Sequence, residues 1–168
     1  TDGPFLVEIS KKGGGHRPGQ LLRANRVAGY GDVEHGDWKM LIWDAKERRP
    51  KMPGGSVGFR WAEKERGHWN LKLEDPTDGS PIDPQLSFLG DCDEVMQVQF
   101  DDFGEGQTLE RVVPVRRIRT VDGTIVRVTT AYDLLMAQYG VSRGLAGDYP
   151  TDYDDQRPYT PAWAEQYT

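Results

Sequence analysis

Five arginines in one stretch of the chain have the clearest capacity for binding chemistry. They are Arg111, Arg116, Arg117, Arg119 and Arg127. Clustered guanidinium groups can bind phosphate or carboxylate through paired hydrogen bonds. The same groups can instead pair with the acidic stretch at residues 91–105, or with another domain. We favour pairing, and keep a role in binding an anion as the alternative.

Other polar groups lack the spacing that catalysis or metal binding requires. The glycines at 13–15 are interpreted as a hairpin loop, because neither GxGxxG nor GxxxxGK is present. Two carboxylate clusters, Asp101/Asp102 and Asp152/Asp154/Asp155, show no D-x-D-x-D-G calcium pattern and are expected to be solvated. GxSxG and HExxH motifs are also absent. We therefore predict no catalytic residue and no metal ligand in this chain.

The single cysteine and the three histidines do not change that prediction. His16, His35 and His68 are too far apart in the sequence to form a ligand signature. Cys92 lies between Asp91 and Asp93, which disfavours its thiolate, so a reactive thiol is not expected. One cysteine also means that no internal disulfide can form.

Composition excludes several classes of protein. With 21 Lys and Arg against 27 Asp and Glu, the net charge is −6, opposite in sign to that of most nucleic-acid binders. No run of 18 apolar residues is present, so no direct membrane insertion is expected. Glycine (20) and proline (11) together exclude a helical bundle. Five tryptophans are expected to stabilise a small core, with a docking face on a partner as the alternative: Trp38, Trp43, Trp61, Trp69 and Trp163.

The elements that would position these residues are mostly short strands. Alternating or β-branched runs predict strands at 5–9, 21–23, 38–44, 57–61, 69–73 and 95–100. Turn-forming residues predict loops at 11–19, 75–84 and 101–106.

The clearest local signal is a hairpin around Asp122-Gly123, between residues 112–121 and 124–129. A two-residue turn would place Ile118 opposite Arg127 and Arg119 opposite Val126. Pro114 cannot donate to a ladder, so its segment is expected at an edge or bulge.

Helical signals are confined to the last third of the chain. Thr130 is a predicted N-cap, with Asp133 in the first turn of the helix. The apolar side of this helix is expected to be Leu134, Leu135, Met136 and Tyr139. Gly140 is expected to end the helix. Residues 141–159 are expected to form a loop. Thr160-Pro161 predicts a second helix, at 160–168. Because two turns without a C-cap are marginal in water, we expect the polypeptide to continue past Thr168.

The predicted fold class is α+β: a β-rich segment with short strands, hairpins and one or two helices. It divides into a β-rich part at 1–129, a helix and loop at 130–159, and a truncated helix at 160–168. We expect these to form a single segment, 1–168, of a larger subunit.

Several stretches resemble the catalytic α subunit of the membrane-bound respiratory nitrate reductases. Those similar to that subunit are Gly55–Glu63 with Trp69–Leu71, Gln85–Gly90, Leu134–Leu145 with its YGVSRGL pattern, and Tyr153–Asp155. Those similar to the wider molybdopterin oxidoreductase superfamily are Thr1–Val7, Leu21–Arg23 and Tyr159–Glu165. Tyr167 departs from the aliphatic residue usual at its position.

The resemblance implies a segment of a larger α/β molybdopterin enzyme that reduces nitrate to nitrite. In that family the α subunit holds a bis-molybdopterin guanine dinucleotide and a 4Fe-4S cluster. Electrons arrive through an iron–sulfur β subunit and a haem-bearing membrane subunit. The enzyme would be membrane-associated through these partners, with the cytoplasmic face favoured over the outer face. The family's aspartate ligand to molybdenum and its cluster ligands match nothing here, and Cys92 matches none of them.

We therefore expect a structural segment that is inactive by itself and holds no cofactor. Two alternatives stay open: an independent β-rich protein-interaction module, and a segment of a related reductase acting on perchlorate or selenate. A coding sequence that continues as helix beyond Thr168 would favour a reductase segment, whereas a stop codon there would favour the module.

Overall fold

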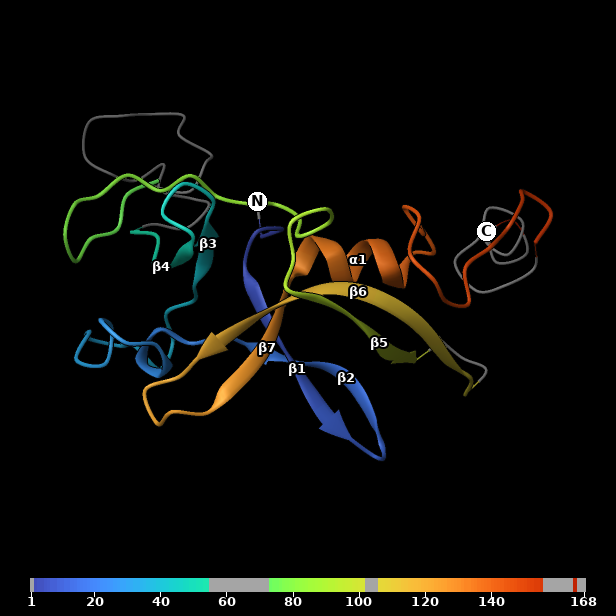
Figure 1. Ribbon diagram of the computed structural model, residues 1–168, viewed down its shortest axis with the longest axis horizontal. Helices are drawn as coiled ribbons and strands as arrows, with labels where there is room; N and C mark the ends of the chain where they lie inside the picture. Colours follow the sequence, from blue (N-terminus) through green and yellow to red (C-terminus); the bar gives the residue numbers. More distant parts are fainter. Residues whose placement is uncertain (1, 55–72, 102–105, 156–164, 166–168) are drawn as a thin grey trace.

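A five-stranded antiparallel sheet forms the main body of the structure (Figure 1). The computed structural model describes residues 2–54, 73–101, 106–155 and 165. The sheet order is β2-β1-β7-β6-β5. Its strands are β1 (Leu6–Lys12), β2 (Gly15–Leu21), β5 (Glu94–Asp101), β6 (Thr108–Arg119) and β7 (Ile125–Thr130).

The remaining elements are short. Strands β3 (Ile42–Asp44) and β4 (Arg49–Lys51) form a separate two-stranded sheet, preceded by the 3-10 helix η1 (Ala24–Arg26). Helix α1 (Ala131–Gln138) follows β7 directly and packs on β6 and β7. In Figure 1, β3 and β4 lie away from α1, across the start of β1. No helix among the described residues is long and apolar enough to span a bilayer.

The large sheet curls until its two edge strands meet. β2 and β5 share no ladder, yet they are in contact. The guanidinium of Arg17 pairs with the carboxylate of Asp101 across the gap. Gly15 lies against the end of the Gln99 side chain, and a Cβ at position 15 would come within 2.6 Å of that flexible amide group, which would have to shift. The two edge strands therefore meet through side-chain contacts rather than through backbone pairing.

Two apolar clusters lie on opposite faces of the sheet, as the alternation of side chains along a strand requires. Leu6 belongs to the first cluster, with Val128, Ile118 and the segment leading to β3. Val7, the next residue, belongs to the second, which β5, β6 and α1 complete. The predicted strands at 5–9 and 95–100 are confirmed as β1 and β5, and the α+β class is confirmed at this coarse level.

The predicted loop at 11–19 is wrong. β1 continues to Lys12, β2 begins at Gly15, and Lys12 pairs with Gly15 around a two-residue turn. Gly13 and Gly14 have φ angles of 61° and 84°, which a primed hairpin turn requires and glycine adopts without steric cost. The strand signal in β2 was hidden because its composition is rich in glycine and proline.

The hairpin of β6 and β7 is confirmed, but its predicted register is wrong by one residue. Ile118 pairs with Val126, and Arg119 with Ile125. The loop has three residues rather than two, because the amide of Gly123 donates to the carbonyl of Thr120, and Gly123 has φ 85°. Pro114 lies in the part of β6 that pairs with β5 only, beyond the ladder with β7.

Helix α1 begins as predicted. The Thr130 hydroxyl accepts from the Asp133 amide, and Gly140 has φ 79°. Its buried side is Asp133, Leu134 and Ala137, so the expected apolar face is only partly correct. Residues 141–155 are free of strand and helix, as expected.

Other expectations differ or fall outside the described residues. The strand predicted at 38–44 is shortened to β3, and 75–84 is a loop as predicted. The strand predicted at 57–61 and, apart from Leu73, the strand predicted at 69–73 lie outside the described residues. So do residues 102–105 and, apart from Glu165, the helix predicted at 160–168.

Candidate functional site

The predicted arginine cluster is engaged by the acidic stretch that precedes it. Arg116 is 2% exposed, and its Nη2 lies 2.7 Å from the Asp91 carboxylate. The guanidinium carbon stacks 4.4 Å from the Trp43 ring centroid and 4.9 Å from that of Phe88. Arg48 hydrogen-bonds Asp91 from the other side and, with Arg116, lowers the pKa of that carboxyl group.

The other arginines of the cluster are also used internally. Arg117 and Arg127 both pair with Glu94, and their hydrogen bonds lower the pKa of that carboxyl group. Arg111 is fully buried, and its guanidinium donates to the carbonyls of Ala137 and Gln138 at the end of α1. The favoured pairing with residues 91–105 is thus confirmed for Arg116, Arg117 and Arg127.

Asp133 is a buried carboxylate that joins three separate parts of the chain. It is 0% exposed and accepts from the Ser87 hydroxyl at 2.6 Å and the Phe88 amide at 2.8 Å. Arg143 pairs with it at 2.8 Å. Charge-assisted hydrogen bonds of this kind are about twice as strong as neutral ones. Sequence reasoning assigned Asp133 to the helix start and missed this junction.

A second set of buried charges supports the β3–β4 region. The Lys51 ammonium is fully buried, 3.3 Å from Asp44 and 2.5 Å from Glu47. Burial alone would lower the pKa of Lys51, but the hydrogen bonds to Glu47 and Asp44 outweigh it and raise that pKa. The Tyr30 hydroxyl donates to Asp75, and burial together with this bond raises the pKa of Tyr30 to about 12. None of these groups was identified from the sequence.

The remaining candidates have surroundings that favour no chemistry. Burial raises the pKa of the Cys92 thiol, and Asp93 and Asp91 add to the effect although Arg116 opposes it. Asp101 pairs with Arg17. Among the described residues, no three His, Cys, Asp or Glu side chains gather in a group that could hold a metal ion.

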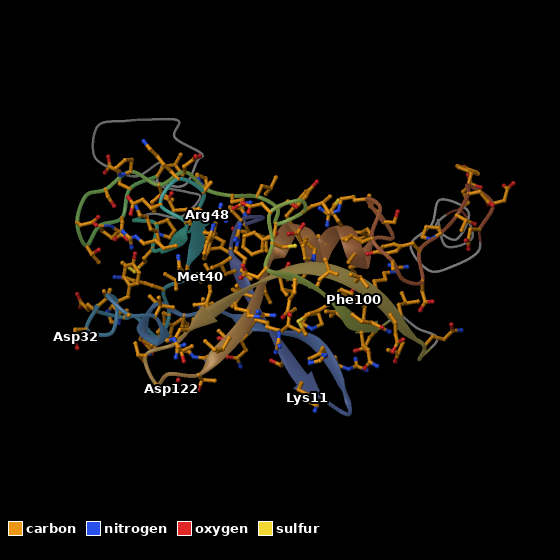
Figure 2. All side chains as sticks on the ribbon, in the orientation of Figure 1. Lys11, Asp32, Met40, Arg48, Phe100 and Asp122 are labelled. Atoms are coloured by element: carbon orange, nitrogen blue, oxygen red, sulfur yellow. The ribbon has the colours of Figure 1, made fainter. Side chains whose placement is uncertain are left out.

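An apolar pocket of about 360 Å³ opens between the start of β1 and the segment leading to β3. Its apolar lining residues are Phe5, Trp38, Met40, Met52, Pro53 and Pro76. Met40 is labelled in Figure 2, where the chain approaches β3. Trp38 is 74% exposed, so its expected place in the core is wrong. Trp43 is buried as expected, whereas Trp61, Trp69 and Trp163 lie outside the described residues.

Comparison with known proteins gives a consistent set of relatives. The nitrate reductase alpha chain of Bacillus subtilis is 38% identical to this chain, and the respiratory nitrate reductase 1 alpha chain of Escherichia coli is 41% identical. The nitrate reductase alpha subunit of Mycobacterium tuberculosis is 36% identical. All three alignments cover the whole of this chain. The chain is homologous to nitrate reductase alpha chains.

This chain spans only 13% or 14% of the length of these three alpha chains. It thus corresponds to one segment of a nitrate reductase alpha chain, as the resemblance predicted. No family model matches the chain.

Two of the described stretches that resemble nitrate reductase alpha chains meet at Asp133. Ser87 and Phe88 belong to the stretch Gln85–Gly90, and Arg143 belongs to the YGVSRGL pattern. Arg143 also stacks over Tyr132, its guanidinium carbon 5.6 Å from the ring centroid. The described side chains in these two stretches therefore make contacts that hold loops against α1.

Proposed function

We propose that this chain is a structural segment of a molybdenum-dependent respiratory nitrate reductase alpha subunit, which reduces nitrate to nitrite. The observation that supports this most strongly is 36–41% identity over the whole chain to nitrate reductase alpha chains. The segment's role is to hold loops and an apolar surface in place within a larger fold of the molybdopterin-enzyme type. It supplies no catalytic residue.

The described residues do not fit the cofactors of such an enzyme. A 4Fe-4S cluster takes four cysteine thiolates, and this chain has one cysteine. A pterin dinucleotide carries a pyrophosphate, but Arg116, Arg117 and Arg127 are already paired with carboxylates of this chain. Under this proposal, bis-molybdopterin guanine dinucleotide and the cluster are held by other parts of the alpha subunit.

The proposed partners follow from the same assignment. The alpha subunit would receive electrons from an iron–sulfur beta subunit. That beta subunit would receive them from a haem-bearing membrane subunit. Membrane association would be through these subunits, on the cytoplasmic face. Neither nucleic acid nor a lipid surface fits a chain of net charge −6.

The test uses the complete polypeptide encoded with this sequence, produced together with its neighbouring subunits in a host that makes molybdenum cofactor. We expect a reduced dye to be oxidised when nitrate is added. The 168-residue chain alone should hold no molybdenum and reduce no nitrate. If the enzyme reduces perchlorate or selenate but not nitrate, it is a related anion reductase with a different substrate. A coding sequence limited to this chain would favour an interaction module.

A further inference from the structure

We draw no further inference here: the strongest candidate, the apolar pocket beside the exposed Trp38 between the start of β1 and the segment leading to β3, carries none because nothing in the structure shows what covers it.

Discussion

β5 and β6 pair over eight residue pairs, whereas β3 and β4 pair over three. Behind the long ladder lie fully buried aliphatic side chains, among them Val98, Val113 and Val115. Behind the short one lie a fully buried lysine, Lys51, and the nearly fully buried carboxylate of Asp44. A short ladder leaves many backbone groups for side chains to satisfy, and Asp44 accepts from the amides of Lys46 and Glu47. The comparison shows that buried charge substitutes for regular pairing in the β3–β4 region.

The largest expected effect is in the β3–β4 region. Lys51→Met leaves the carboxylate of Asp44 buried without its cation, which should lower the free energy of unfolding by about 4 kcal/mol. The measurement is urea unfolding followed by tryptophan fluorescence. The control is Lys46→Met, an exposed lysine on the same turn, which should change the free energy of unfolding by less than about 0.5 kcal/mol. Equal effects of the two substitutions would contradict the role given to buried charge.

The second prediction concerns alkaline pH. Tyr30 has a folded-state pKa of about 12, above the ordinary value of about 10. Its contribution is therefore complete below pH 10 and is lost as pH rises to 12, because the unfolded chain ionises first. A folded-state pKa of about 12 against an ordinary value of about 10 corresponds to a stabilisation of at most about 3 kcal/mol.

Tyr30→Phe is the control for that measurement. The pKa of Lys51 is also raised, so its contribution to stability is lost as pH rises above the ordinary lysine value, in both proteins. The difference in unfolding free energy between the native chain and Tyr30→Phe should therefore shrink between pH 10 and pH 12. If the difference in unfolding free energy stays constant with pH, the pKa of Tyr30 is not raised in the folded chain.

A smaller effect is expected in the sheet. Val98→Ala removes two buried methyl groups from β5 and should cost about 2 kcal/mol, the sum of lost burial and a partly unfilled cavity. Val95 lies on the same strand but is 55% exposed. Val95→Ala should have an effect within about 0.5 kcal/mol in the same urea titration. A larger loss at Val95 than at Val98 would mean that the face assigned to the core is wrong.

The sheet could be predicted from the sequence further than the β3–β4 region could. Asp122-Gly123 and Thr130 act through neighbouring residues, so the position of the hairpin and the helix cap were predicted correctly. The register was missed because the three-residue loop depends on an amide of Gly123 reaching Thr120, which a dipeptide signal does not specify. β2 was missed because its pairing with β1, rather than its own composition, makes it a strand.

Candidate binding groups were predictable where a cluster of arginines and a run of carboxylates both stood out in the sequence. The pairing of Arg116 with the acidic stretch was recognised in this way. Asp133 was missed as a junction because Ser87 lies 46 residues away, and only the fold brings the two together. Lys51 and Asp75 were missed because a buried charge cannot be distinguished from a solvated one by sequence alone.

The smallest expected effect is at the N-cap of α1. There the local Thr130 cap lies beside the contacts of Asp133 with the distant Ser87 and Phe88. Thr130→Ala removes the hydroxyl that accepts from the Asp133 amide at 3.0 Å, which should cost about 1 kcal/mol. Thr130→Ser keeps the hydroxyl and should retain most of the stability. Amide exchange at Asp133 separates the cap from general destabilisation, because only Thr130→Ala frees that amide. If amide exchange at Asp133 is unchanged in Thr130→Ala, the contacts of Asp133 with Ser87 and Phe88 stabilise the start of α1 without the cap. A buried charge would then stabilise the start of α1 as it does the β3–β4 region.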